Sequence, residues 1–404
     1  MPPRTAEAGV RGRPLAGVVV LALEQAVAGP FATRQLADLG ARVIKIERPG
    51  TGDFARGYDE TVQGMSSAFF WANRSKESIA LDLKHPDAPA VLERLVSRAD
   101  VLVQNLAPGA AERLGLDSDR LRADHPRLVV CNISGYGQDG PYRDRKAYDL
   151  LVQGEAGIIS LTGTPQEPAK VGTSIADIAG GMYAYSGVLA ALLERERTGE
   201  GTVLDVSLFD SLVEWMSYPL YYTEYGGTAP ARMGTSHPTI APYGAFRTKD
   251  GHEVLLAVQS EREWRRFCGV VLGDEGPAED PRFCTMSARV ANRPELQRLV
   301  GDRLAALTVE EAVALLDRAE IASAHVTEVT DLADHPQLRA RGRWRDVDSP
   351  VGQVPALVPP VVPRGADPRM DPVPELGAHT DSVLRWLGYT VEDTQRMRQQ
   401  GLSA

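Results

Sequence analysis

Asp177 is the residue whose surroundings most suggest chemistry, because it lies among apolar and tiny residues in the segment 172–182. Ser174 precedes it by three positions, which is the spacing of a helix N-terminal capping box. We therefore expect a helix to begin here, with backbone N–H groups and the positive end of the helix dipole beside the acid. Such a carboxylate stays ionised, and an ionised carboxylate is able to act as a nucleophile.

A purely structural interpretation of the same segment remains open. Capping boxes are common, and an acid in a first turn often does no more than stabilise its helix. Gly180 and Gly181 carry no side chain, so either a neighbouring helix or a ligand is able to approach the backbone there. The segment alone favours the structural role, and the choice depends on the rest of the chain.

Other kinds of catalytic chemistry lack their sequence signals. The chain has no G-x-S-x-G elbow, and its seven histidines lack metal-ligand spacing, so we expect no hydrolase triad and no metal site. The three cysteines share no ligand spacing either, which favours reduced thiols. The loop 24–30 is not a G-x-G-x-x-G turn, and its Pro30 lacks the N–H group that a dinucleotide pyrophosphate would use. Hydride transfer with a dinucleotide is therefore disfavoured.

Composition limits the class of protein further. The 404 residues are 43% hydrophobic and 24% charged, which predicts a soluble protein of more than one domain. A net charge of -10 with no basic block argues against binding to nucleic acid. Residues 1–14 contain no apolar stretch, and the apolar run 18–23 is too short to span a bilayer. We expect a cytoplasmic protein without a membrane segment.

The elements that must position Asp177 follow an alternating pattern. Short apolar runs alternate with amphipathic stretches, which is typical of an α/β fold with a doubly wound, Rossmann-like parallel sheet. In such a sheet the ligand crevice lies beyond the carboxyl ends of the strands. Strands are expected at 17–23, 43–47, 101–105, 128–133 and 203–208, and helices at 31–39, 86–98, 117–124 and 182–194.

The composition changes after residue 226. A turn at Lys249-Asp250-Gly251 between two apolar runs predicts a β-hairpin, and three helical stretches follow it. We expect a small α+β domain at 226–325 and a large domain at 1–210 that is completed by a tail at 330–404. The proline-rich part of this tail, 349–374, is expected to run extended, and a last helix near 391–400 is expected to be capped by Thr390.

Several motifs in a fixed order carry a resemblance to a known family. Each motif is weak alone, but together they cover nearly the whole chain and resemble the family III CoA-transferases of the CaiB/BaiF type. The motifs are at 15–21, 28–31, 36–47, 80–83, 104–105, 108–109, 135–137, 148–149, 172–182, 192–201, 264–267, 280–283 and 376–379.

The resemblance implies a covalent mechanism. In that family an aspartate at the position of Asp177 attacks an acyl-CoA thioester, and an acyl-aspartyl anhydride and then an aspartyl-CoA thioester form. Asp149 corresponds to a second carboxylate near the nucleophile, so it is a further catalytic candidate. CoA thioesters serve as substrates, and no permanently bound cofactor is implied. The CoA-binding positions are matched here by Arg48, Lys76, Asn105, Arg113, Lys146 and Tyr148.

The segment 232–243 is similar to the corresponding stretch of transferases that act on short dicarboxylates. The resemblance implies succinyl-CoA as donor and itaconate, mesaconate, citramalate or malate as acceptor. Arg232 or His237 is then expected to bind the far carboxylate, which a guanidinium does well. A loop that only links two domains is an equally good interpretation of this segment. Relatives form interlocked homodimers, so we expect the same assembly here.

Two other functions stay open at this point. The same fold hosts α-methylacyl-CoA racemases, in which a histidine before the second aspartate serves as a base. This chain has Tyr148 there, and a phenol with an ordinary pKa near 10 is a poor base at neutral pH. Transfer is therefore favoured over racemisation. The remaining alternative is a protein that binds acyl-CoA without turnover.

Overall fold

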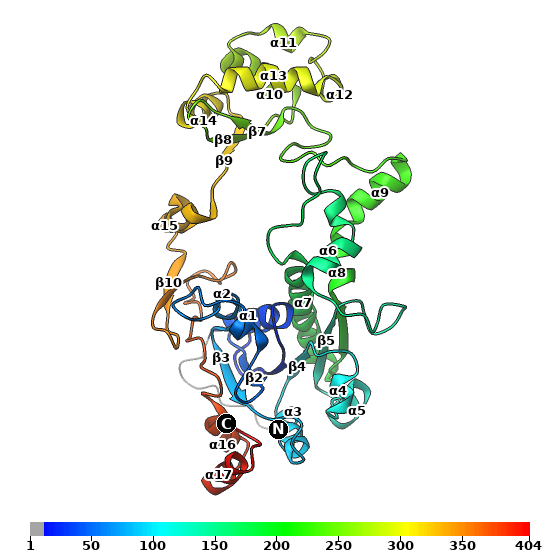
Figure 1. Ribbon diagram of the computed structural model, residues 1–404, viewed down its shortest axis with the longest axis vertical. Coiled ribbons are helices and arrows are strands. Elements are labelled where there is room, and N and C mark those ends of the chain that lie inside the picture. The colour runs from blue at the N-terminus through cyan, green and yellow to red at the C-terminus, as the bar shows by residue number, and fades with distance from the viewer. Residues whose placement is uncertain (1–11) are drawn as a thin grey trace. The chain divides into compact units, whose positions relative to one another are not determined.

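The computed structural model describes residues 12–404, and residues 1–11, which begin the predicted large domain, lie outside the described part. The described residues, 12–404, divide into two compact units (Figure 1). The first unit contains residues up to 157, residues 171–217 and residues 339–404. The second unit contains residues 158–170 and 218–338. The division differs from the expected boundaries mainly in the excursion 158–170, which leaves the first unit and returns to it.

A six-stranded parallel sheet forms the centre of the first unit. Its strand order is β3-β2-β1-β4-β5-β6, so the order reverses between β1 and β4, as in dinucleotide-binding folds. The predicted parallel sheet is thereby confirmed, with β3 as a strand that was not predicted. The strands are β1 (Val19–Leu23), β2 (Arg42–Glu47), β3 (Lys76–Ala80), β4 (Val101–Gln104), β5 (Val129–Ser134) and β6 (Val203–Ser207).

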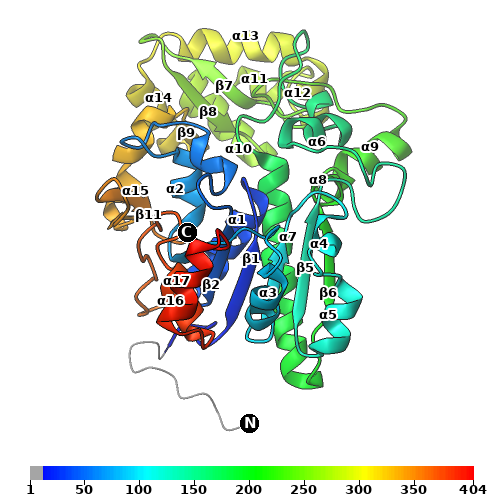
Figure 2. The ribbon, with the colours of Figure 1, turned by 60° about the horizontal axis from the view of Figure 1, so that its bottom comes forward.

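Helices cover both faces of this sheet because its strands are apolar on both sides. Strand β1 is buried along its whole length, which requires a cover on each face. The odd-numbered residues of β1 belong to a core cluster with α3 (Ala88–Val96) and α16 (Thr380–Trp386). Helices α1 (Ala28–Asp38) and α7 (Ile175–Thr198) pack against each other and contact the sheet (Figure 2).

Short helices connect the strands of the first unit and carry several of the candidate residues. Except for α6, they begin at a capping side chain or a glycine, for example Asp53, whose side chain accepts from the Ala55 N–H. These helices are η1 (Phe54–Gly57), α2 (Ser67–Asn73), α4 (Ala110–Arg113), α5 (Ser118–Asp124), α6 (Asp149–Glu155) and α8 (Leu208–Trp215).

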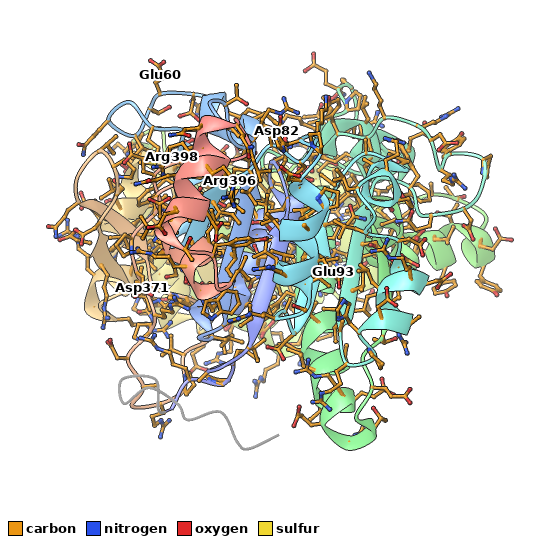
Figure 3. All side chains as sticks on the ribbon, turned by 90° about the horizontal axis from the view of Figure 1, so that it is seen from below. Glu60, Asp82, Glu93, Asp371, Arg396 and Arg398 are labelled. Carbon is orange, nitrogen blue, oxygen red and sulfur yellow. The ribbon has the colours of Figure 1, made fainter. Side chains whose placement is uncertain are left out.

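The C-terminal tail returns to the β3 end of the sheet. The expectation of little regular structure at 349–374 is wrong in part, because β10 (Trp344–Val347) pairs with β11 (Val354–Leu357) as an antiparallel hairpin. The predicted last helix is confirmed as α17 (Val391–Gln399), with the expected Thr390 capping box. Figure 3 shows α17 with Arg396 and Arg398 beside the sheet. The tail closes on β3 through the Ala80 N–H, which donates to the Thr380 hydroxyl.

The second unit has its own core around an antiparallel sheet in the order β7-β8-β9. The predicted hairpin is confirmed, since β7 (Tyr243–Arg247) pairs with β8 (Glu253–Ala257) across the expected turn. Strand β9 (Ala322–His325) adds to β8. The accompanying elements, with α15 crossing the unit boundary, are η2 (Ile158–Ser160), α9 (Ser217–Gly226), α10 (Glu261–Arg266), η3 (Phe267–Leu272), α11 (Gly276–Glu279), α12 (Met286–Ala291), α13 (Arg293–Leu304), α14 (Val309–Arg318), η4 (Val329–Asp334) and α15 (Pro336–Ala340).

Helix α7 is the one helix among residues 12–404 that is long and apolar enough to cross a membrane. It also packs against α1, α6 and α8 and the strands β5 and β6. These contacts are those of a core helix in a globular unit, and they fix the segment that carries Asp177.

Candidate active site

Asp177 lies in the first turn of α7, as the sequence predicts, but the cap of that helix is a different residue. The side chain of Ser174, at the N-cap position, makes no capping hydrogen bond, so the expected capping box is wrong. Instead Asp149 Oδ1 accepts hydrogen bonds from the backbone N–H groups of Ala176 at 2.8 Å and Asp177 at 3.4 Å. The acid that stabilises the start of α7 therefore comes from α6, and Asp177 is left free of this structural task.

The two carboxylates change each other's chemistry. Burial, and then the negative charge of Asp149, raise the pKa of Asp177 from 3.8 to about 7. The expectation that helix-end dipoles keep this acid ionised well below neutral pH is therefore wrong. The helix N–H groups that would favour the charged form are directed to Asp149 instead. A more basic carboxylate is a better nucleophile once it is ionised, and near pH 7 it exists in both forms.

Tyr58 lies in the electrostatic range of both Asp177 and Tyr148. Burial, then Asp53, Asp177 and Tyr148, raise the pKa of Tyr58 to about 12, so its hydroxyl keeps its proton. Tyr148 is 66% exposed and directly precedes α6. The sequence patterns did not reveal Tyr58, because it follows the short helix η1 and belongs to no motif. Its neutral phenol is able to donate a hydrogen bond near the nucleophile.

Neighbouring elements occupy the space beside the two glycines that follow Asp177, so no open space is left there. A Cβ atom at Gly180 would meet Leu208 Cδ2 at 2.5 Å, and one at Gly181 would meet the Ala28 carbonyl oxygen at 2.8 Å. Of the two interpretations of these glycines, close approach of neighbouring backbone and side chains is therefore the one that the structure supports. They lock α7 against α1 and α8.

The loop after β1 rests on a buried group of four charges. Lys45 Nζ lies 2.8 Å from Asp53 and 3.4 Å from Glu24, and Lys76 Nζ lies 2.6 Å from Glu24. All four side chains are fully buried. Burial alone would raise the pKa of Glu24, but Lys76 and Lys45 more than offset it, and that pKa is lowered. Pairing with the two lysines thus keeps the Glu24 carboxylate ionised inside the fold.

This buried group holds the backbone at 24–26 in one conformation. Ala26 has a φ of 64°, which a residue with a Cβ rarely adopts, and its N–H donates to Asp53 Oδ1. Asn105 bonds to Gln25 twice, accepting from its N–H and donating to its carbonyl, each at 2.8 Å. Asn105, predicted to bind CoA, is not among the residues that line the pocket described below, and its amide fixes the β1 loop.

Lys76, expected near CoA, is instead one of the four fully buried side chains of this group. Its ammonium donates to Glu24 Oε1, the Pro30 carbonyl and Asn73 Oδ1, and its side chain has no accessible surface. Burial, together with the nearby Lys45 charge, lowers the pKa of Lys76 to about 7 despite the partner Glu24. All three N–H bonds are used within the fold, so in this structure the lysine faces no pocket.

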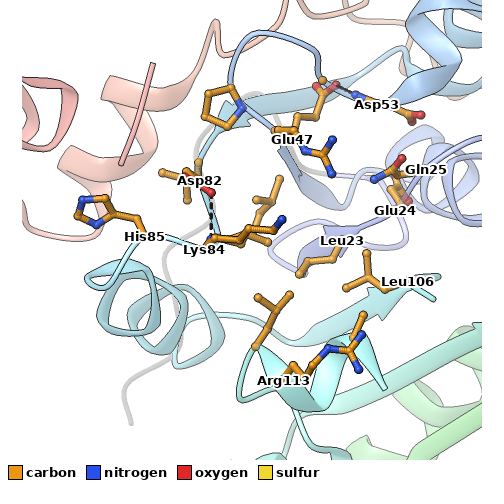
Figure 4. A pocket seen from close by; sticks show the side chains of 18 of the residues that line it. Leu23, Glu24, Gln25, Glu47, Asp53, Asp82, Lys84, His85, Leu106 and Arg113 are labelled. Atoms are coloured by element: carbon orange, nitrogen blue, oxygen red, sulfur yellow. Dashed lines mark hydrogen bonds between the residues drawn. The ribbon is translucent and has the colours of Figure 1, made fainter. Parts of the chain in front are cut away.

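A large pocket opens at the carboxyl ends of β1 and β2, at the place where the strand order reverses (Figure 4). Its volume is about 1080 Å³, at the upper end of the range for cofactor sites. Apolar walls come from Leu23, Ile46, Leu81 and Leu106. The residues that line the pocket do not include Asp177. The pKa of Tyr58 is raised both by Asp53, which lines the pocket, and by Asp177.

The unpaired charges that line this pocket are mostly positive. Its buried acids have partners inside the fold: Glu24 and Asp53 pair with lysines, and Glu47 pairs with Arg56. Arg48 and Arg113, both predicted CoA-binding residues, line the pocket and are exposed. Lys84 and His85 also line it and were not predicted, since nothing in the sequence distinguishes Lys84 from Lys76. A polyanion with an apolar part fits such a wall.

The remaining predicted residues lie elsewhere. Lys146 is exposed and precedes Tyr148 in the first unit. Arg232 and His237 belong to the second unit, where the Arg232 guanidinium donates to the carbonyl groups of Ser160, Thr164 and Pro165. The His237 ring stacks on Tyr243 at 5.2 Å, and its Nδ1 accepts from the Thr239 N–H. In this structure both side chains stabilise their own loop.

A search for metal centres gives no candidate in the described part of the chain. Among residues 12–404 no group of three or more His, Cys, Asp or Glu side chains is placed to hold a metal ion. Cys131 and Cys268 are buried and Cys284 is half-buried, and all three are free thiols.

Comparison with known proteins identifies the family. Residues 15–380 match the model of CoA-transferase family III. Succinate–glutarate CoA-transferase of Agrobacterium fabrum is 36% identical over 95% of this chain and 98% of its own. Succinyl-CoA–D-citramalate CoA-transferase of Chloroflexus aurantiacus is 32% identical over 94% of this chain and 96% of its own.

Solved structures agree. A CaiB/BaiF family protein of Brucella suis superposes with a TM-score of 0.82 at 35% identity, over 93% of this chain and 99% of that one. A protein of Mycobacterium tuberculosis gives a TM-score of 0.82 at 31% identity, over 91% and 98%. These matches confirm the resemblance in sequence motifs: the chain belongs to CoA-transferase family III and is a CoA-transferase.

Proposed function

We propose that this enzyme moves CoA from succinyl-CoA to a short dicarboxylic acid, with Asp177 as the covalent carrier. The observation that carries the proposal is the pairing of a semi-buried, basic carboxylate at Asp177 with a large cationic pocket in the same unit. The named relatives act on glutarate, mesaconate and D-citramalate with succinate or succinyl-CoA, which supports a dicarboxylate acceptor.

The chemistry proceeds in four exchanges that conserve atoms and charge. An Asp177 oxygen attacks the thioester carbonyl and the C–S bond breaks. The products are an acyl-aspartyl anhydride and CoA, which leaves as a thiolate. The thiolate then attacks the Asp177 carbonyl carbon, and succinate leaves with the bonding electron pair. The acceptor carboxylate attacks the resulting aspartyl-CoA thioester and releases the thiolate. The thiolate finally attacks the acceptor side of the new anhydride, which frees Asp177.

The cationic pocket supplies the binding energy for CoA in this proposal. Arg48, Lys84 and Arg113 are placed to neutralise phosphate groups, and the apolar wall suits the adenine. Asn105 holds the β1 loop, whose Glu24 and Gln25 line the pocket, in one conformation. Lys146 and Tyr148 contribute from the approach to α6.

Arg232 and His237 are proposed as candidate ligands of the acceptor acid. Their present contacts hold the loop in shape, so their role would require new or shared hydrogen bonds on binding. We also propose that the enzyme is cytoplasmic and forms an interlocked homodimer, as the tail and the family resemblance suggest.

Trapping of the covalent intermediate tests the mechanism. Incubation with succinyl-CoA and hydroxylamine should convert Asp177 into a hydroxamate, which peptide mass spectrometry locates. Full turnover with an unmodified Asp177 would sink the covalent mechanism. Uptake of deuterium at the α-carbon of a branched acyl-CoA would instead favour a racemase, and CoA binding without either result would favour a non-catalytic protein.

A panel of acceptor acids identifies the substrate. Succinyl-CoA is mixed in turn with glutarate, mesaconate, citramalate, itaconate, malate and oxalate, and liquid chromatography separates the CoA esters formed. We expect the highest kcat/KM with one of the acids of four or five carbons. A preference for oxalate would contradict the expected length of four or five carbons.

A further inference from the structure

Gln153 is a completely buried polar residue next to the nucleophile's helix. It lies on α6, has no exposed surface, and uses both ends of its amide. Its Nε2 donates to Asp149 Oδ2 at 2.7 Å, and its Oε1 accepts from the Val171 N–H at 2.9 Å. One partner can only accept and the other can only donate, so the orientation of the amide is determined by its neighbours.

The two partners of Gln153 reach the start of α7 by different routes. Asp149 uses its second oxygen to accept from the N–H groups of Ala176 and Asp177, so one carboxylate links Gln153 to the first turn. Val171 is the residue at which the chain returns from the excursion 158–170 into the first unit. The same amide thus holds the cap of α7 and the segment that leads into α7.

We propose that Gln153 is a positioning residue for the transfer reaction, because it fixes Asp149 and Val171 and thereby the orientation of the Asp177 carboxylate. This inference rests on the proposed role of Asp177 as the nucleophile. Gln153 itself touches no substrate in this scheme. A carboxylate that attacks a thioester must be held near one geometry, and errors of about 1 Å cost on the order of 10²-fold in rate.

Two substitutions separate positioning from general stability. Gln153→Met keeps the length and packing of the side chain but removes both hydrogen bonds. Gln153→Glu keeps the acceptor for Val171 and, when protonated, also restores the donor to Asp149. The titratable groups linked to this site are Asp149, which bonds to Gln153, and Asp177, whose pKa Asp149 raises. Since both carboxylates are present in every enzyme compared, rates are expressed relative to wild type at each pH.

The measurement is the single-turnover rate of covalent labelling at Asp177 with saturating succinyl-CoA, alongside the Kd for CoA. At pH 8 both variants should label at least about tenfold more slowly, while the Kd for CoA changes less than twofold. Between pH 8 and pH 6 the relative rate of Gln153→Glu should rise several-fold, because the introduced carboxyl gains a proton beside Asp149. The relative rate of Gln153→Met should stay constant.

A matched control is Gln104→Met. Gln104 is also buried and bonds through both amide ends, to Asn132 and to the Leu106 N–H, but it lies on the sheet. Its variant should lose stability without a selective loss of labelling rate at saturation. Labelling within twofold of wild type for both Gln153 variants would overturn the inference, as would a loss of CoA affinity equal to the loss of rate. Absence of labelling in the wild type would instead overturn the proposed function.

Discussion

Two groups of buried charges in the first unit treat their carboxylates in opposite ways. Around Glu24, two acids alternate with two lysines, and the lysines more than offset the cost of burial, so that the pKa of Glu24 is lowered. Around Asp177, burial is reinforced by a second acid, and the pKa is raised to about 7. The first arrangement produces a rigid wall for the pocket. The second produces a carboxylate with a raised pKa, and the sign of the neighbouring charge makes the difference.

The largest expected effect comes from removing one partner of the paired group. Lys45→Met leaves Asp53 buried without its ion-pair partner and Glu24 with Lys76 alone, and should lower the free energy of unfolding by about 3–5 kcal/mol in urea denaturation at pH 7. The double variant Lys45→Met with Asp53→Asn should recover part of the loss. A loss under about 1 kcal/mol would show that the group is not held together by charge pairing.

Removal of the reactive carboxylate should have the opposite sign. The pKa of Asp177 in the folded protein lies above its unfolded value of 3.8, so the folded state binds more protons and the wild type loses stability as pH rises from about 4 through 7. Asp177→Asn escapes this cost. It should be about 4 kcal/mol more stable than wild type at pH 8, since each pKa unit of the shift contributes about 1.4 kcal/mol, with no difference near pH 3.5, and should give no covalent labelling.

A pH-independent difference in these unfolding experiments would count against a raised pKa. The stability of Asp149→Ala, measured in parallel, gives the cost of losing the helix cap, about 1 kcal/mol.

Asp149→Asn tests how the two acids interact. The amide oxygen is still able to accept from the N–H groups of α7, but the negative charge is gone, so the pKa of Asp177 should fall. The acidic limb of the rate profile for covalent labelling should therefore move to lower pH. An unchanged limb would mean that burial alone sets the pKa of Asp177.

The smallest effect is expected at an exposed lysine. Lys84→Gln should weaken CoA binding about threefold and reduce its dependence on salt, without a change in stability, because Lys84 is exposed in the pocket wall. Isothermal titration at two salt concentrations measures this. Lys249→Gln, at an exposed lysine of the second unit, should leave the affinity unchanged. Equal effects of the two substitutions would argue against the pocket as the CoA site.

The sequence predicts the parts of this molecule that local patterns determine. Apolar runs placed β1, β2, β4 and β5, and the segment around Asp177 was correctly assigned to the start of a helix. Strand β3 was not predicted because its sequence, KESIA, mixes polar with apolar residues, and the polar ones are buried only through distant partners.

The misassigned contacts were those made across long separations. Ser174 has the local spacing of a cap, but Asp149, 27 and 28 residues before the N–H groups it binds, takes that role. Lys76 and Lys84 look alike in sequence, and only the approach of Glu24 decides that Lys76 is buried while Lys84 lines the pocket. Gln153 carries no motif, and its role depends on a chain segment that leaves and returns.

The two glycines that lock α7 have a practical meaning for anyone who wishes to redesign this enzyme. No side chain fits at Gly180 or Gly181 without displacing Leu208 or the backbone of α1, so α7 can pack in only one position. Random mutagenesis there would yield mainly unfolded protein and few altered activities. Mutant libraries meant to change the acceptor acid are better directed to exposed loops, with residues 175–182 left unchanged.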